Sequence, residues 1–247
     1  MDAPVPRPSH PIPKRGSRDA WFEREGHAER VLSVLRTGTP DQREIAATTL
    51  AAFEVSRAEP ALIACLEYPA HTVREACARA LGRCGGERAV EPLIDAGMAQ
   101  RIAIASVRDA LSTLPESATK PIAAATRHDA GIVRALAARE LGNRRGHDSA
   151  LIAALADPET QVRVQAVLAL AERSSTDDIA REALMTRTHD PEPSVRAALC
   201  SVLRSCGTDG AQCLRQLSRD SDEWVARSAE VALSCSVATS RRALNSY

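Results

Sequence analysis

The stretch that decides the fold is Val162-Arg163-Val164-Gln165-Ala166-Val167-Leu168-Ala169-Leu170, because its pattern returns along the chain. In each copy a leucine stands seven residues after an anchor position, which Arg163 occupies in this stretch. The seven anchors are Arg43, Arg74, Ile104, Arg134, Arg163, Arg196 and Ala226. Their steps of 31, 30, 30, 29, 33 and 30 residues define a period. A period of about 30 residues is typical of a repeat architecture.

Each repeat is predicted to hold two short helices, called helix A and helix B in chain order. In the fifth repeat we expect helix A over about 148–156 and helix B over about 160–172. Val162, Ala166 and Leu170 recur every four residues, which is the periodicity of a helix and not of a strand. The intervening Asp157-Pro158-Glu159 suits a turn, because Asp caps helices and Pro fits their first turn.

One helix pair cannot bury its own apolar face, so neighbouring pairs must stack on one another. We therefore predict an all-α fold, an α-solenoid of about seven helix pairs that forms a right-handed superhelix. The B helices are expected on its concave side. Glycines at or just past the ends of the B helices are expected to adopt the left-handed C-cap conformation. They are Gly82, Gly85, Gly86, Gly142, Gly146 and Gly207.

The solenoid is expected to span residues 17–235, between a tail at 1–16 and a C-terminal tail at 236–247. The first tail holds five of the fourteen prolines, a density that excludes helix and predicts disorder. Its Pro8-Ser9-His10-Pro11 spacing leaves open a docking peptide for an aromatic groove.

A first helix is predicted from about residue 18 to residue 36, with Ser17 as its N-cap. It carries Trp21 and Phe22, two large side chains in a chain with only 2% aromatic residues. Because terminal repeats need a cap, these side chains are expected to cover the open end of the first repeat. A partner contact is the alternative role.

Composition narrows the class of protein. The 247 residues are 44% hydrophobic and 26% charged with a net charge of zero, which fits a globular protein. The basic excess of a general nucleic-acid binder is missing. No apolar run is long enough for a membrane span, and the N-terminus lacks the apolar core of a secretory signal. These features predict a cytoplasmic protein that does not enter a membrane.

The seven cysteines are odd in number and include no CxxC motif, so we expect reduced thiols and no metal site. Aromatic residues are absent between positions 69 and 223. The core is therefore expected to consist of Ala, Leu, Val and Ile, which suits closely stacked helices.

The repeat resembles a known family. Leu151, Leu155, Asp157-Pro158, Val162-Arg163, Ala166 and Leu170 follow the pattern L-x-x-x-L-x-D-P-x-x-x-V-R-x-x-A-x-x-x-L. This pattern is similar to the short HEAT-like repeat of phycobilisome-lyase-type HEAT proteins. The resemblance covers about residues 29–235. It implies an α-solenoid that serves as a scaffold with a binding surface.

Some proteins with such repeats are enzymes, and the resemblance was tested against each. Deoxyhypusine hydroxylase holds iron through His-Glu dipeptides, and this chain contains none. Bilin lyases and alkylpurine DNA glycosylases bind ligands that favour aromatic stacking, and the middle of this chain lacks aromatic residues. The sequence therefore favours a protein without catalytic activity, metal or cofactor, and a lyase-type or glycosylase-type enzyme is the least favoured alternative.

The repeated arginine has a structural interpretation. In HEAT-like repeats such arginines resemble a ladder that bonds to turn aspartates or to helix-end carbonyls of neighbouring units. Asp157 and Asp190 are the candidate partners. An anion-binding ladder is the alternative. The predicted ladder consists of Arg43, Arg74, Arg134, Arg163 and Arg196.

Three His-Asp dipeptides were considered as metal ligands: His128-Asp129, His147-Asp148 and His189-Asp190. All three fall in predicted turns between helices. Histidines on separate turns, about 10 Å or more per repeat apart, do not converge on one metal. They are interpreted as turn residues.

A possible binding surface follows from the register. Positions five and nine after each anchor should face solvent on helix B. In the second to fourth repeats these positions include three arginines, Asp109 and Asn143, and three further arginines lie close in sequence, so this half of the face is predicted to be basic. In the later repeats the same positions hold Leu168, Glu172, Ser201, Ser205, Val231 and Cys235, which predicts a neutral to apolar face. The predicted partner-binding residues are Arg79, Arg83, Arg108, Arg139, Arg144 and Arg145.

Two functions from different classes remain open. The favoured one is a non-enzymatic scaffold or adaptor that binds an acidic segment of a protein partner on its concave helix-B surface. The alternative is nucleic-acid binding through the same arginines, which zero net charge disfavours. The sequence does not indicate the identity of the partner or the oligomeric state.

Overall fold

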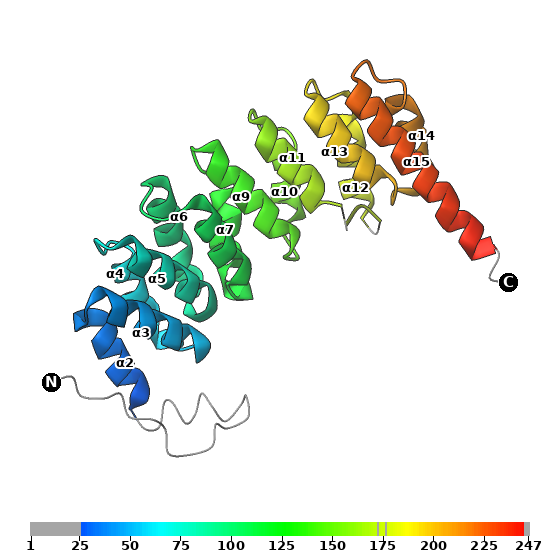
Figure 1. Cartoon of the computed structure of the whole chain (residues 1–247). Helices are drawn as coiled ribbons and strands as arrows, with labels where there is room; N and C mark the ends of the chain where they lie inside the picture. Colours follow the sequence, from blue (N-terminus) through cyan, green and yellow to red (C-terminus); the bar gives the residue numbers. More distant parts are fainter. Residues whose placement is uncertain (1–25, 172, 176, 245–247) are drawn as a thin grey trace. The chain divides into compact units, whose positions relative to one another are not determined.

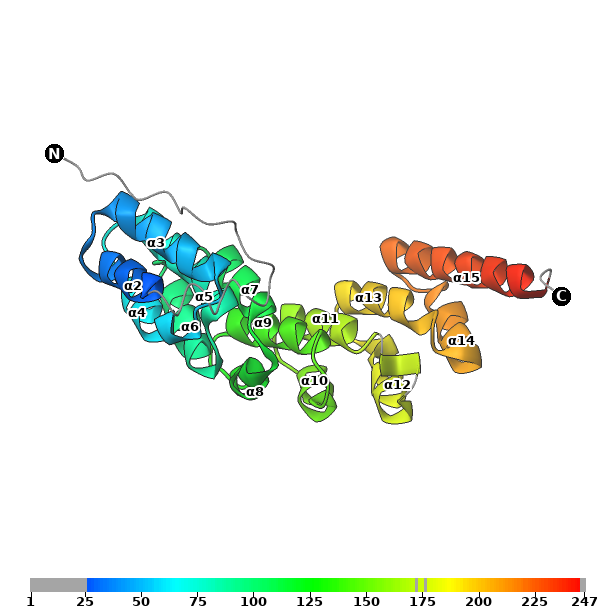
Figure 2. The same ribbon diagram turned by 90° about the horizontal axis from the view of Figure 1, so that it is seen from below.

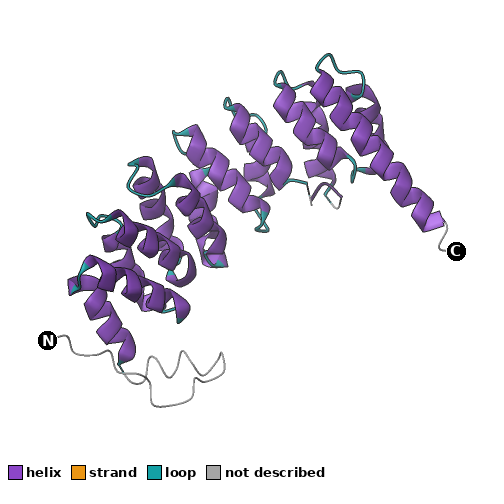
Figure 3. Cartoon of the chain, in the orientation of Figure 1, coloured by secondary structure: helices purple, strands orange, loops and turns teal. Residues whose placement is uncertain are grey.

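The computed structural model describes residues 26–171, 173–175 and 177–244. Every regular element in these ranges is a helix, and Figure 3 shows these helices joined by short loops. No helix in the described ranges is both long enough and apolar enough to cross a membrane.

Fourteen α-helices form the described part of the chain. They are α2 (His27–Thr37), α3 (Pro40–Ala52), α4 (Glu59–Cys65), α5 (His71–Cys84), α6 (Val90–Met98), α7 (Ile104–Thr113), α8 (Thr119–Ala125), α9 (Gly131–Gly142), α10 (Asp148–Ala154), α11 (Thr160–Ala169), α12 (Asp178–Met185), α13 (Pro193–Leu203), α14 (Gly207–Leu217) and α15 (Glu223–Leu244). Short 3-10 turns accompany them at η1 (Ser56–Ala58), η2 (Glu87–Ala89), η3 (Glu116–Ala118), η4 (Arg173–Ser175) and η5 (Thr186–His189). The helices form seven successive A–B pairs, from α2–α3 to α14–α15, which confirms the predicted α-solenoid.

The pairs are distributed over two compact units, residues 1–118 and 119–247. In the first unit the B helices α3, α5 and α7 pack side by side, and the A helices α2, α4 and α6 each pack against one of them. In the second unit the B helices α9, α11, α13 and α15 pack side by side in the same way, and the A helices α8, α10 and α14 pack against them. The A helix α12 packs mainly against the turns η4 and η5. Figures 1 and 2 show the helix pairs in two views. The handedness of the superhelix stays a prediction.

The leucine column of the repeat forms the core of each unit. Six of its seven members are at most 1% exposed, and Leu233 is half-buried. The six are Leu50, Leu81, Leu111, Leu141, Leu170 and Leu203. Alanines such as Ala46, Ala76 and Ala166 fill the spaces between them. Small side chains at these positions let the B helices approach closely.

Two local predictions need correction. Gly82 and Gly142 lie inside α5 and α9 and are not left-handed caps. A Cβ on Gly82 would lie 3.0 Å from the Ala110 Cα of α7, so the glycine is needed for close helix packing. Gly85 and Gly86, with φ of −80° and −130°, are not left-handed either. Gly146 and Gly207 have the predicted positive φ, at 85° and 64°.

The turn aspartates also differ from the expected helix caps. Glu159 is the N-cap of α11 and makes no side-chain cap bond. Asp157 lies two residues earlier, and its Oδ1 accepts the Glu159 amide at 2.9 Å. Its carboxylate shapes the turn, and both of its oxygens also accept hydrogen bonds from Arg134 in the preceding repeat.

Three predicted segments lie partly or wholly outside the described residues. The predicted tail at 1–16 and the first part of the predicted helix at 18–36, including Trp21 and Phe22, lie outside the described residues. The boundary at residue 235 is not marked by a helix end, because α15 continues to Leu244. Whether residues 236–247 act as a separate tail stays a prediction.

Candidate functional site

The arginines of the second unit link consecutive repeats by one recurring geometry. Arg163 donates from Nε and Nη2 to both carboxylate oxygens of Asp190, each at 2.9 Å. Its Nη1 donates to the carbonyls of Asp157 and Pro158 in its own turn. Each guanidinium therefore joins the turn of its own repeat to the turn of the next.

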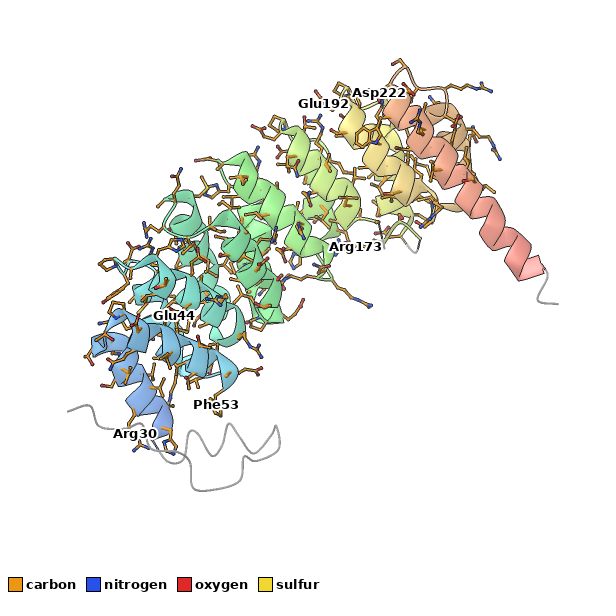
Figure 4. The ribbon with its side chains drawn as sticks, in the orientation of Figure 1. Arg30, Glu44, Phe53, Arg173, Glu192 and Asp222 are labelled. Carbon is orange, nitrogen blue, oxygen red and sulfur yellow. The ribbon has the colours of Figure 1, made fainter. Side chains whose placement is uncertain are left out.

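The same pattern recurs on both sides of Arg163. Arg134 bonds both oxygens of Asp157 at 2.7 and 2.9 Å, and Arg196 bonds both oxygens of Asp220 at 2.8 Å. In each case Nη1 also donates to two carbonyls of the preceding turn. Bidentate pairs of this kind fix geometry as well as charge, because the planar guanidinium matches the carboxylate. Figure 4 labels Glu192 and Asp222, which directly precede the first residues of α13 and α15.

The arginines of the first unit use carbonyls instead of aspartates. Arg74 donates from Nε to the carbonyl of Arg101 at 2.7 Å and from Nη1 to Tyr68 and Pro69. Arg43 donates to the carbonyls of Leu35, Arg36 and Gly38. These bonds reach the ends of neighbouring helices. All five arginines are thus engaged by the protein, which leaves little of each guanidinium for an external anion.

The ladder makes stability depend on pH. Burial raises the pKa of Asp157, but its bond from Arg134 and the Glu159 amide outweigh burial and lower it. The bond from Arg196 lowers the pKa of Asp220. A carboxyl with a lowered pKa in the folded state stabilises the fold above its unfolded pKa of about 3.9, and this contribution is lost as the pH falls through the folded value.

We therefore expect the stability advantage of the wild type over Arg196→Gln to shrink between about pH 5 and about pH 3. The measurement is the urea midpoint at several pH values, followed by circular dichroism. An advantage that stays constant over this interval would show that the Arg196–Asp220 pair is not the source.

The predicted partner-binding arginines are placed on the surface with one exception. Arg79 and Arg83 lie one helical turn apart on α5 and are exposed. Arg83 approaches Glu54 at 3.6 Å, and Arg108 pairs with Asp109 at 2.9 Å. In the second unit, Arg145 is exposed and Arg139 lies 3.9 Å from Glu140. Three of these arginines thus have a carboxylate nearby, which weakens the basic character that the sequence suggests.

Arg144 departs from the predicted surface. It is only 7% exposed, and its Nη1 donates to Thr119 Oγ1 at 3.3 Å. The side chain packs against the start of α8 instead of facing solvent. Arg144 is therefore removed from the candidate binding residues.

A more distinctive surface lies between α13 and α15. An open hollow of about 450 Å³ is lined there by Ala197, Cys200, Trp224 and Val231, with Arg204 and Arg227 among its other lining residues. Trp224 is 59% exposed and Val231 is 58% exposed. We call this hollow the α13–α15 groove. It lies on the exposed side of two neighbouring B helices.

The repeat register predicts part of this groove. Val231 and Ser201 stand five residues after their anchors, and both are exposed as the register predicts. The apolar character of the later repeats was therefore visible. Trp224 was missed as a binding residue, because its exposure depends on where α15 begins and on the spacing between α13 and α15.

The His-Asp dipeptides are used locally. The His128 ring accepts the amide of Ala130, the His189 ring bonds Gln216, and Asp190 belongs to the arginine ladder. Over residues 26–171, 173–175 and 177–244, no group of three or more His, Cys, Asp or Glu side chains is arranged to hold a metal ion.

Comparison with known families now decides the classification. The sequence profile of HEAT repeats matches residues 28–114 and 148–234, which together exceed half of the chain. The chain belongs to the HEAT repeat family. The second matched segment of this HEAT repeat protein includes the α13–α15 groove. No curated protein matches its sequence significantly.

Several solved structures resemble this HEAT repeat protein. An engineered protein shares 18% identity over 86% of this chain and 97% of its own, with a TM-score of 0.39. Human deoxyhypusine hydroxylase, in complex with glycerol, shares 17% identity over 92% and 91%, with a TM-score of 0.41. A designed armadillo repeat protein shares 17% identity over 83% and 98%, with a TM-score of 0.38. These likenesses concern the fold, and nothing about function follows from them.

Proposed function

We propose that this HEAT repeat protein is a non-enzymatic scaffold that binds a protein partner in the α13–α15 groove. The partner contributes a segment in which an apolar side chain stands beside carboxylates. The observation that carries the proposal is the exposed Trp224 and Val231 at the walls of an open apolar hollow.

Exposed apolar side chains gather around the α13–α15 groove. Large apolar side chains gathered around a concavity favour burial by a partner, whereas single exposed ones need no explanation. Trp224 and Val231 line the same hollow together with Ala197 and Ala232. Tryptophan is among the residues that most often dominate binding energy at protein interfaces. An apolar side chain of the partner would cover these surfaces.

Positive charge is brought to the α13–α15 groove by Arg204 and Arg227. Arg204 is exposed, and its side chain makes no hydrogen bond or ion pair with the residues that the structure describes. Arg227 bonds Glu223 at 2.6 Å, but both side chains are largely exposed, so the pair is weak and exchangeable. Two cations beside an apolar hollow favour a partner with carboxylates.

Secondary contacts for acidic side chains are proposed at the exposed Arg79 and Arg83 and the half-buried Arg108 on the first unit, and at the exposed Arg139 and Arg145 on the second. Their nearby carboxylates limit this role, because Glu54, Asp109 and Glu140 already offset part of the charge. Charge reversal of Arg79 and Arg83 is therefore expected to weaken partner binding less than changes in the groove.

The test begins with random peptides displayed on phage and selected against the whole protein. Enriched peptides are expected to combine an apolar residue with Asp or Glu. Binding of labelled enriched peptides is then measured by fluorescence anisotropy. Trp224→Ala and Arg204→Glu should each weaken binding at least about tenfold, because both remove contacts at the centre of the groove.

The matched controls come from the same unit but from its A helices. Ile179 on α12 is 70% exposed, and Arg215 on α14 is exposed. Ile179→Ala and Arg215→Glu should leave peptide binding unchanged. Enrichment of basic peptides, or equal losses in the control variants, would refute the groove as the site. Retention of labelled DNA or RNA at about 50 mM salt by the wild type, lost in Arg79→Glu/Arg83→Glu, would favour the nucleic-acid alternative instead.

A further inference from the structure

A pair of thiols in the second repeat stands apart from the other cysteines. Cys65 ends α4, and Cys77 lies in the middle of α5. Cys65 is 6% exposed and Cys77 is fully buried. Each thiol lies within interaction range of the other, across the packed pair of α4 and α5. They therefore face one another between the two helices of one repeat.

A hollow gives small molecules access to one of these thiols. It has a volume of about 370 Å³, and Cys65 lines it together with Arg36, Arg43 and Tyr68. The Arg43 guanidinium lies 4.5 Å from the centre of the Tyr68 ring and is held by the carbonyls of α2. The hollow thus presents positive charge beside the sulfur, while Cys77 stays behind it in the core.

The surroundings favour a thiolate at Cys65. The interaction with Cys77, helped by the charge of Arg43 and opposed by burial, lowers the pKa of Cys65 to about 7. The pKa of Cys77 is raised by the same interaction and by burial. Burial raises the pKa of both Cys84 and Cys200 to about 11. Thiolates are the reactive form of cysteine, so Cys65 is the activated thiol among these four.

We propose that Cys65 and Cys77 form a peroxide-sensitive thiol pair, in which Cys65 reacts first and Cys77 closes a disulfide between α4 and α5. This site is independent of the partner-binding groove, which lies in the other unit.

The chemistry takes two steps with hydrogen peroxide as the oxidant. The Cys65 thiolate sulfur attacks one peroxide oxygen, the O–O bond breaks, and the departing hydroxide takes up a proton to give water. Cys65 is oxidised to a sulfenic acid. The Cys77 sulfur then attacks the Cys65 sulfur, the S–O bond breaks, and a second water leaves with the proton of Cys77. Two thiols and one peroxide become one disulfide and two waters.

The first test uses the unmodified full-length protein. Iodoacetamide labelling at pH about 7, with each cysteine followed by peptide mass spectrometry, should modify Cys65 at least about tenfold faster than Cys84. Labelling of Cys65 at the rate of Cys84 would overturn the proposal without any question of misfolding. The hollow, not surface exposure, accounts for the difference, since both side chains are buried.

The second test adds hydrogen peroxide before digestion. Trypsin cleaves after Arg57, Arg74 and Arg79, so Cys65 and Cys77 leave in different peptides and a disulfide joins them. The wild type and the control Cys84→Ala should both yield the joined peptides. Cys77→Ala removes both the resolving thiol and the interaction that activates Cys65, so Cys65 should react more slowly with peroxide, and the sulfenic acid that does form should persist and be trapped by dimedone. Peroxide treatment that joins no Cys65 peptide to a Cys77 peptide would contradict the pair.

Discussion

Replacing Arg163 with alanine is expected to lower the free energy of unfolding of the second unit by about 3–5 kcal/mol. Arg163 is 8% exposed and Asp190 is 5% exposed, so the substitution leaves a carboxylate buried without its counter-charge. It also removes the bonds to the Asp157 and Pro158 carbonyls. A buried ion that loses its partner costs more than the pair itself contributes.

The measurement is urea unfolding followed by far-UV circular dichroism, with the midpoint compared between variants. The matched control is Arg227→Ala, which breaks the Arg227–Glu223 pair on the exposed face of α15. This control should change stability by no more than about 0.5 kcal/mol. Equal losses for the two variants would mean that the ladder holds the repeats no more firmly than an ordinary surface pair.

A double substitution separates the lost charge pair from the lost turn. Arg163→Met with Asp190→Leu removes both charges and leaves no buried ion. It is expected to recover only part of the stability, because Asp190 Oδ1 also accepts the amide of Glu192 at 3.0 Å. The remaining deficit measures the combined contribution of this turn and of the bonds that Arg163 makes to the Asp157 and Pro158 carbonyls.

Truncation of the leucine column is the second large effect. Leu170→Ala is expected to cost about 2–5 kcal/mol, because Leu170 is fully buried and its removal opens a cavity in a close-packed core. Leu168, two residues earlier, is 46% exposed. Leu168→Ala changes the same residue type in the same segment and should cost well under 1 kcal/mol.

The urea midpoints of these two variants test the register directly. A large loss in Leu168→Ala together with a small loss in Leu170→Ala would mean that the B helix is rotated relative to this structure. Equal losses would mean that neither face is packed as described. Either result would contradict the repeat frame on which the fold was predicted.

The solenoid was predictable because its determinants are local and repeat. Leu141 and Leu170 occupy equivalent positions, and burial of one helix face follows from their spacing with Val133 and Val162. The pattern of a single helix is weak evidence, but its repetition along the chain makes the prediction reliable. The residues that depart from the pattern, such as Ile104 at the third anchor, were visible only as exceptions.

Details that depend on packing between helices could not be predicted from the sequence. Gly82 resembles a helix cap in sequence, and only the approach of α7 shows that it makes room for Ala110. Arg144 is buried against the start of α8, a contact that short-range propensity does not specify. Arg74 donates to the backbone carbonyl of Arg101. Every residue type has such a carbonyl, so the sequence does not identify this partner.

The α13–α15 groove also combines features that the sequence predicts with features that depend on packing. Its exposed position at Val231 follows from the register, but its depth depends on how α13 and α15 pack. Trp224 is one of two tryptophans in the chain, and the sequence pattern predicts no role for it. Its position beside Arg204 and Arg227 links an apolar surface to positive charge, and that combination exists only in three dimensions.

The most direct test of the scaffold account is the emission of Trp224 during peptide binding. In Trp21→Phe the indole of Trp224 is the only tryptophan. A tryptophan-free peptide of leucines and glutamates should shift the emission to shorter wavelength with saturation, because the exposed indole becomes buried. Arg204→Glu should abolish this shift, and a peptide with lysines in place of the glutamates should not produce it. Unchanged emission with the acidic peptide, or an equal shift with the basic one, would contradict the proposed partner and its site.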